Sequence, residues 1–218
     1  MSSTTTTANT RHKRWLIFLA TAFLVVGLFG GWVAIQFANG SWRLTPPSYK
    51  GMTLQSPELL PDIEMMSTTG ERVSLSDYRG KVVLLFFGYT SCPDICPATL
   101  LELRTAVREL GGDSDQIQVV MVTVDPQRDD VPRLKQYVTQ FDERFIGLVG
   151  TDEELIASAA QYGIFYQAHE VEGSQAGYFM DHTAAIMAFD KDGYLRLMYP
   201  FGMTGGDIAA DMRYLIKE

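Results

Sequence analysis

The sequence predicts an α/β domain with a mixed sheet, preceded by one transmembrane helix. Residues 15–37 form one uncharged apolar run, and residues 58–218 alternate between short β-rich runs and helical patterns. Strands joined by helices favour a parallel core, and two apolar runs flanking a turn near the C-terminus add an antiparallel edge. A hydrophobic content of 46% excludes a disordered chain, and two cysteines are too few for a disulfide-stapled scaffold.

The N-terminal segment has the properties of a membrane anchor. As a helix, residues 15–37 would span roughly 34 Å, enough to cross a hydrocarbon core of about 30 Å. Residues 11–14 are basic, so the positive-inside rule places the tail, residues 1–14, in the cytoplasm and the rest of the chain outside it. A cleaved signal peptide is the alternative, but its apolar region is shorter, about 7–15 residues, and no clear A-x-A site follows here.

A linker and an acidic outer domain follow the predicted anchor. Residues 38–57 are rich in Gly, Pro and Ser and are predicted to be the linker, and residues 58–218 the domain. Residues 1–37 contain three basic and no acidic residues, so the rest holds 15 basic and 26 acidic residues, a net charge of −11. Such a domain shows no sign of nucleic-acid binding. Because no long transit peptide is seen, we expect a single-pass protein of the inner (plasma) membrane with a periplasmic or otherwise extracytoplasmic domain.

The outer domain divides into recognisable elements. The continuous apolar run at 82–87, VVLLFF, is typical of a strand buried on both faces. Leucines and valine at helical spacing predict a helix over 98–110 that ends at the glycines 111–112. The other expected strands are 117–124, 145–149, 183–189 and 194–199, the other expected helices are 132–141, 152–162 and 207–217, and a small hairpin is expected within 61–75.

Turn and capping residues support these bounds. Thr151 or Asp152 can cap the start of the helix 152–162, and Gly163 can end it. Gly193 closes a turn that needs a positive φ. The resulting order is the layout of a thioredoxin-like sandwich, although periodicity alone also allows other three-layer α/β folds.

Both cysteines of the chain lie in one loop, CPDICP, between a buried strand and a helix. Active groups of open α/β sheets gather at this edge. Pro97 suits a first helical turn, which places Cys96 at the helix start and Cys92 one turn upstream, where the helix N-terminus favours thiolates. Thiols at this spacing could hold a soft metal ion or close a disulfide. A structural disulfide around so short a loop would add little stability.

The donor types favour copper over structural zinc. Soft thiolates select Cu(I) or zinc, and a structural zinc site needs four nitrogen or sulfur ligands. His12 lies on the other side of the predicted membrane, and His169 lies in a polar stretch where we expect it to be solvated. His182 directly precedes the strand 183–189, where a thioredoxin-like layout would bring it against the cysteine loop. From spacing alone, a loop histidine bonded to Asp181 or to the backbone is an equal alternative.

Three segments together resemble the Sco/SenC family: FFGYTSCPDICP, VTVDPQRDD (122–130) and DHTAAIMAFDKDG (181–193). The family consists of membrane-anchored, thioredoxin-fold copper-binding proteins that assist assembly of copper centres, notably CuA, in haem–copper respiratory oxidases. The resemblance covers nearly the whole chain. It implies that copper, as Cu(I) and Cu(II), binds Cys92, Cys96 and His182. It also implies that the copper-accepting subunit of an oxidase is the partner, with a copper donor or thiol reductant upstream.

Further residues match the family pattern without being expected ligands. The resemblance implies that Asp125, Pro126 and Asp129 shape the loop beside the site. Asp94 would add negative charge near the metal or bond within its own loop. The segment 164–180 is the variable part of the family pattern, so the resemblance says least about a partner-binding surface there.

The leading functional hypothesis is a metallochaperone, which passes copper on by ligand exchange and is not an enzyme. The alternative is a thiol–disulfide oxidoreductase in which Cys92 and Cys96 are the redox-active pair that reduces the acceptor's cysteines before metal loading. Thioredoxin-like reductants usually carry C-x-x-C and a cis-proline before the last hairpin, whereas this chain has C-x-x-x-C and His182-Thr183. A peroxidase fits less well, because Thr90 lies two residues before Cys92 where peroxiredoxins have three.

Overall fold

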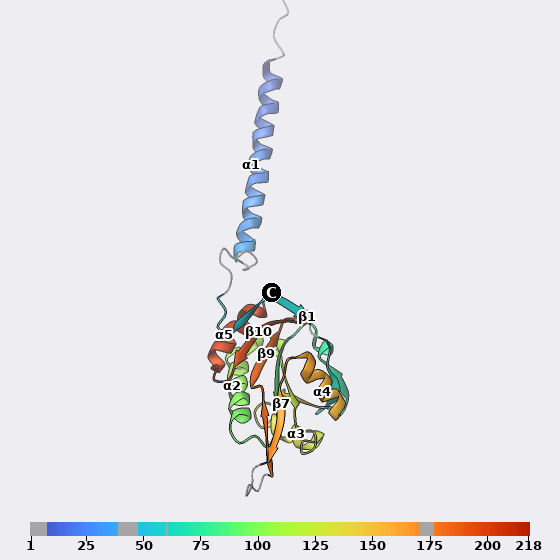
Figure 1. Cartoon of the computed structure of the whole chain (residues 1–218). Coiled ribbons are helices and arrows are strands. Elements are labelled where there is room, and N and C mark those ends of the chain that lie inside the picture. Colours follow the sequence, from blue (N-terminus) through green and yellow to red (C-terminus); the bar gives the residue numbers. More distant parts are fainter. Residues whose placement is uncertain (1–7, 39–47, 60, 171–176) are drawn as a thin grey trace, which may run out of the picture. The chain divides into compact units, whose positions relative to one another are not determined.

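The computed structural model describes residues 8–38, 48–59, 61–170 and 177–218. It divides into two units, residues 1–48 and residues 49–218. The first contains helix α1 (Ala8–Ala38), and the second contains the remaining elements (Figure 1).

Helix α1 confirms the expected N-terminal apolar helix. Its apolar window, Lys13–Gln36, is 24 residues long with a mean hydropathy of 2.3, and none of it is buried among the residues that the structure describes. At 1.5 Å per residue this window covers roughly 36 Å, enough to cross a membrane.

The second unit is built on an eight-stranded mixed sheet in the order β1-β10-β9-β4-β5-β6-β2-β3. The central strands β4, β5 and β6 are parallel, and the other neighbours are antiparallel. The strands are β1 (Met52–Leu59), β2 (Glu64–Ser67), β3 (Arg72–Ser74), β4 (Val82–Gly88), β5 (Ile117–Thr123), β6 (Ile146–Val149), β9 (Ala185–Phe189) and β10 (Tyr194–Pro200). A parallel core with an antiparallel C-terminal pair confirms the predicted sheet.

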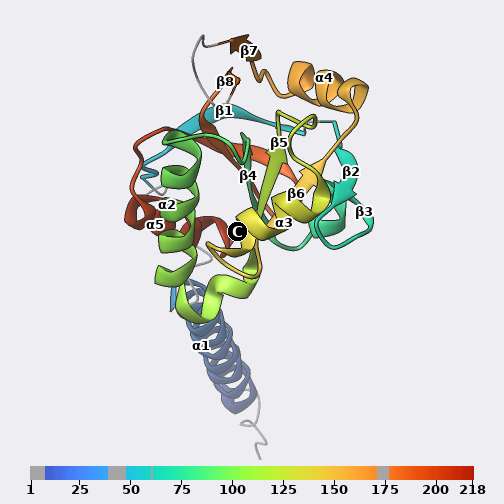
Figure 2. The same ribbon diagram turned by 90° about the horizontal axis from the view of Figure 1, so that it is seen from below.

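Helices cover both faces of this sheet. They are α2 (Ile95–Glu109), α3 (Val131–Thr139), α4 (Asp152–Gln161) and α5 (Gly205–Leu215), with short 3₁₀ turns at Leu75–Tyr78 and Gly111–Gln116. Helices α2 and α5 pack together on one side, and α4 lies on the other (Figure 2). Every residue of β4 and β5 is therefore buried, which explains why β4 is a continuous apolar run and why β5 is apolar except for Gln118 and Thr123.

Local sequence signals explain most element bounds. The Thr151 side chain and the Glu154 side chain form a reciprocal capping box at the start of α4. Gly163 and Gly193 have φ angles of 65° and 82°, as a helix end and a hairpin turn require. Helix α2 starts at Ile95, three residues earlier than predicted, because Pro97 occupies a first-turn position whose N–H needs no helical partner.

The structure differs from the prediction in two places. Strand β1 occupies residues that the sequence predicts as linker. It pairs only with β10 at the sheet edge, where Pro57 is tolerated. A second, separate hairpin of β7 (Tyr166–Glu170) and β8 (Tyr178–His182) was not predicted. Strand β7 is largely exposed and β8 is mostly half-buried, so neither has the alternation of buried and exposed residues that marks a strand in the sequence.

Candidate metal centre

The structure brings Cys92, Cys96 and His182 together. Their donor atoms, two thiol sulfurs and one imidazole nitrogen, all lie within 4.8 Å of one another. The two cysteines are free thiols. Residues 86 positions apart in the chain therefore form one compact donor set of two soft ligands and one borderline ligand, which suits copper.

The start of α2 positions the cysteines. Cys92 lies in a turn closed by its backbone N–H, which donates to the Tyr89 carbonyl at 3.3 Å. Cys96 is the second residue of the helix, and its backbone N–H donates to the Cys92 sulfur at 3.3 Å. The predicted placement, with Cys96 at the helix start and Cys92 one turn upstream, is confirmed, and a first-turn N–H that has no partner within the helix, that of Cys96, bonds to the Cys92 sulfur.

His182 is the last residue of β8, and its two ring nitrogens have different partners. Nδ1 lies 3.2 Å from the carbonyl oxygen of Thr183, so Nδ1 carries the proton in the neutral ring. Nε2 lies 3.4 Å from the Cys96 sulfur. A backbone bond at one nitrogen fixes the ring and leaves the other free to ligate, which is the usual arrangement of metal-binding histidines. Of the two alternative partners considered from the sequence, the backbone bond is therefore present at Nδ1, whereas the Asp181 carboxylate pairs with His169.

Burial differs among the three donors. Cys96 is fully buried, whereas Cys92 and His182 are partly exposed. Cys92 and His182 border a cleft of about 310 Å³, whose other lining residues are Tyr89, Pro93, Asp94, Ile95, Phe179, Met180 and Asp181. A partner can thus reach two of the three donors while Cys96 keeps its place in the protein interior.

The environment separates the acidities of the two thiols. The pKa of the Cys92 thiol is lowered, chiefly because the Cys96 thiol donates a hydrogen bond to the Cys92 thiolate, and further because of hydrogen bonds from the backbone N–H groups at the start of the helix. The pKa of the Cys96 thiol is raised by the same hydrogen bond and by burial. The metal-free site therefore holds one thiolate and one thiol, and a metal that binds both sulfurs must release the proton of Cys96.

A buried carboxylate fixes the loop that carries the cysteines. Asp129, fully buried, accepts hydrogen bonds from the backbone N–H of Thr90 at 2.9 Å, from the Thr90 hydroxyl at 2.5 Å and from the Thr123 hydroxyl at 2.6 Å. Arg133 donates to the Thr90 hydroxyl at 2.8 Å and to Ser91 at 3.1 Å. Asp129 lies outside the donor set, and its role in shaping the adjacent loop is as expected.

Other predicted residues lie beside the centre. His169 is exposed and pairs with Asp181 at 3.2 Å, in agreement with the expected solvated position. Asp94 is exposed and precedes α2 without capping it through its side chain. Gly88, at the end of β4, leaves the space that Cys96 needs, because a Cβ there would lie 3.1 Å from its sulfur and 2.6 Å from the Phe86 ring.

Two aromatic residues of the site were not predicted. The rings of Tyr89 and Phe86 meet the His182 imidazole edge-on, at centroid distances of 5.8 and 6.1 Å. Both are buried, and burial raises the pKa of Tyr89 to about 12. The sequence signal that could have identified them is their position immediately before the cysteine loop, at the end of a central strand where such folds bind their ligands.

Comparisons with known proteins agree with this geometry. A family profile described as SCO1/SenC matches residues 52–217. The mitochondrial SCO2 homologue of Mus musculus is 32% identical over 202 residues, which cover 89% of this chain and 78% of that protein. The copper-bound structure of Bradyrhizobium japonicum ScoI is 31% identical, with a TM-score of 0.66 over 72% of this chain and 99% of that one. The apo Sco1 structure from Thermus thermophilus is 36% identical, with a TM-score of 0.69 over 77% and 97%. These likenesses confirm the thioredoxin-like α/β fold.

Proposed function

The chain belongs to the SCO1/SenC family, and from this membership we propose that it carries copper on Cys92, Cys96 and His182 for the assembly of a cytochrome c oxidase. It is a copper-binding protein of the Sco type with a Cys–Cys–His site. The observation that carries the assignment of ligands is the convergence of three donor atoms within 4.8 Å at the sheet edge where such folds bind their ligands.

The donor set accommodates both oxidation states of copper. Two thiolates satisfy Cu(I), which prefers soft ligands, and the imidazole adds the nitrogen that Cu(II) favours. Because two of the three protein ligands, Cys92 and His182, line an open cleft, an acceptor's own sulfur or nitrogen can join the copper before these two leave it. We infer that the copper centre CuA of a haem–copper oxidase is the destination and that transfer proceeds by ligand exchange.

The N-terminal helix defines where this transfer takes place in our proposal. Residues 15–37 would anchor the chain in the inner membrane, with the basic tail 1–14 in the cytoplasm and the folded unit on the outer side. The length and composition of α1 and the basic residues at 11–14 support this topology. The acceptor would be an oxidase subunit that exposes its copper ligands on the same side.

A thiol–disulfide oxidoreductase remains the second candidate function. The lowered pKa of Cys92 favours the thiolate needed for attack on a disulfide, and the neighbouring Cys96 could resolve the mixed disulfide. This reaction would oxidise the two cysteines to a disulfide and reduce the acceptor's disulfide to two thiols. It assigns no role to His182 as a metal ligand, which separates the two functions.

The proposal predicts one tightly bound copper ion per full-length chain in detergent. Anaerobic titration with Cu(I), and separate titration with Cu(II) followed by the absorbance of thiolate-to-copper charge transfer, measures the stoichiometry. The copper-loaded protein should then transfer its copper to the soluble copper-binding domain of an oxidase subunit. This transfer should be faster than the delivery of copper from a chelator in solution to the same domain. A chain that binds no copper but rapidly reduces a disulfide in the same domain would instead establish the oxidoreductase.

A further inference from the structure

The hairpin β7–β8 determines the position of His182 but has little support from the rest of the fold. Among the strands that the structure describes, β7 and β8 pair only with each other, outside the eight-stranded sheet. None of the described side chains in these strands is fully buried. Within the described residues, no bonds of the main sheet fix the hairpin, and its core contacts are those of half-buried side chains such as Tyr166 and Met180. Elements held in this way open more easily than a central sheet.

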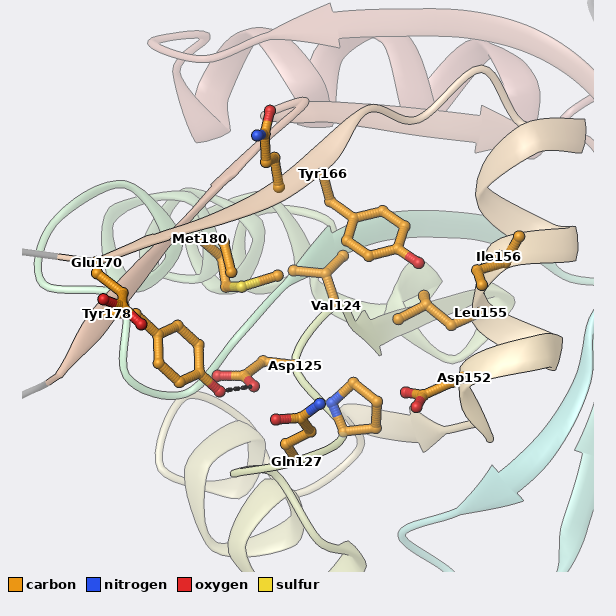
Figure 3. A pocket seen from close by; sticks show the side chains of 13 residues that line it. Val124, Asp125, Gln127, Asp152, Leu155, Ile156, Tyr166, Glu170, Tyr178 and Met180 are labelled. Carbon is orange, nitrogen blue, oxygen red and sulfur yellow. Dashed lines mark hydrogen bonds between the residues drawn. The ribbon is translucent and has the colours of Figure 1, made fainter.

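A cavity beneath the hairpin accounts for the missing packing. It has a volume of about 690 Å³ and lies between the hairpin, α4 and the loop that follows β5 (Figure 3). Tyr166 and Met180 face it from the hairpin, and Val124 and Leu155 from the opposite walls. The hairpin thus rests on discrete contacts at its two ends and on a few side chains between them.

The end of the hairpin nearest His182 is held mainly by hydrogen bonds. The backbone N–H of Thr183 donates to the Phe165 carbonyl at 2.9 Å, and the backbone N–H of Phe165 donates to the Thr183 hydroxyl at 3.0 Å. These bonds join the two strands of the hairpin at its base. They tie residues of the hairpin to each other. The contacts of this end with the strand before the cysteine loop are the edge-on rings of Phe86 and Tyr89 and a long bond of 3.4 Å from the Met180 N–H to the Tyr89 hydroxyl.

Three residues hold the opposite end, and we call them the Arg128 clamp: Asp125, Arg128 and Tyr178. Arg128 forms an ion pair with Asp125, whose side chain is 2% exposed. Arg128 also donates to the Tyr178 carbonyl oxygen at 3.0 Å, and its guanidinium carbon lies 3.7 Å from the centre of the Tyr178 ring. The Tyr178 hydroxyl donates to Asp125 at 2.7 Å (Figure 3).

The chemistry of the clamp depends on a planar cation. A guanidinium can pair with a carboxylate, stack on an aromatic ring and donate to a carbonyl at the same time, whereas an ammonium acts as a point charge. Asp125 and Arg128 belong to the loop after β5, and the Asp125 backbone N–H donates to Thr123 at the end of that strand. The clamp therefore ties β8 to the rigid sheet that also carries the cysteines.

We propose that the Arg128 clamp is a positioning device that holds His182 within reach of the two cysteines, and that it thereby sets the preference of the site for Cu(II). This inference rests on the proposed function of His182 as a copper ligand. A loosened hairpin would move the imidazole and leave the two sulfurs in place. Cu(II) binding, which uses the nitrogen, would weaken, while Cu(I) binding by the sulfurs would persist.

Two conservative variants of the full-length chain in detergent test the clamp. Arg128→Lys keeps the charge but loses the planar contacts, and Tyr178→Phe keeps the ring but loses the bond to Asp125. Arg144→Lys is the matched control, because Arg144 makes a comparable planar pair with Asp142, at 2.8 and 2.9 Å, among residues outside the centre. Hydrogen exchange of the metal-free protein and the affinities for Cu(I) and Cu(II) are measured for each.

In both clamp variants we expect the β8 amides to exchange about 10-fold faster, with the exchange of β4 and α2 unchanged. Cu(II) affinity should fall about 10- to 100-fold, and Cu(I) affinity by less than about 3-fold. Wild-type β8 exchange and wild-type Cu(II) affinity in both variants would overturn the proposal. So would equal losses of Cu(I) and Cu(II) affinity together with faster exchange throughout the domain, because these indicate general destabilisation.

The exchange measurement also separates this inference from the proposed function. If wild-type protein binds no copper, the proposed function fails, and the exchange rates of the metal-free variants still decide whether the clamp holds β8. If His182→Ala weakens Cu(II) binding but the clamp variants do not, the proposed function stands and the clamp is rejected.

Discussion

Full-length protein carrying Cys92→Ser is expected to lose at least about 100-fold in affinity for both Cu(I) and Cu(II), because substitutions of groups that only support a ligand already cost about 10- to 100-fold. The serine hydroxyl is a hard donor and stays protonated near neutral pH, so it cannot replace a soft thiolate. The thiolate-to-copper absorbance of the Cu(II) form should disappear as well. Competition against chelators of known affinity, for each oxidation state, measures the change.

The variant suits this test because Cys92 is only partly buried, so a serine in its place leaves no unpaired hydroxyl deep in the core. Cys96→Ser should have the same effect on copper and a larger one on stability, since Cys96 is fully buried. Ser76→Ala is the control, because it changes a residue outside both the donor set and the cysteine loop. Retained copper affinity in both cysteine variants would place the metal elsewhere.

Replacement of His182 by Ala is expected to separate the two oxidation states of copper. The variant loses the only nitrogen donor of the described Cys–Cys–His cluster, so Cu(II) affinity should fall at least about 100-fold and Cu(I) affinity less than about 10-fold. Affinities from the same chelator competition, with electron paramagnetic resonance of the Cu(II) form, give both values. The nitrogen hyperfine pattern should be lost in the variant.

The chain contains a matched control for this prediction. His169→Ala removes another histidine of the same hairpin, one that pairs with Asp181 and lies outside the cluster. It should bind both ions as the wild type does. Equal weakening of Cu(I) and Cu(II) in His182→Ala, or an equal effect of the two histidine substitutions, would argue against His182 as a ligand.

The parts of the fold that bury apolar residues could be predicted from the sequence. Strands β4 and β5 are almost entirely apolar because helices cover both of their faces. Leu100 and Leu103 in α2 lie at helical spacing because one side of that helix meets the sheet. Strand β1 has no such apolar pattern in the sequence, since it is an edge strand that is held in place by its pairing with β10. Exposed strands are stabilised by partners that lie far away in the sequence.

The site was predictable to a similar extent. Both cysteines fall in one loop next to a strand end and a helix start, which local rules recognise. His182 remained ambiguous from its spacing, because its approach to Cys96 depends on the fold of the intervening 86 positions. The Arg128 clamp joins residues 50 positions apart through a carbonyl, a ring face and a buried carboxylate, and no spacing rule describes such a contact.

The central claim is that Cys92, Cys96 and His182 together hold one copper ion. Copper K-edge X-ray absorption of the loaded full-length protein tests it most directly, because the spectrum reports the atoms bound to the metal. We predict two sulfur neighbours in both oxidation states, and an added imidazole nitrogen with its characteristic outer-ring scattering in the Cu(II) form. Spectra with fewer than two sulfur neighbours, or with oxygen and nitrogen neighbours only, would contradict the account.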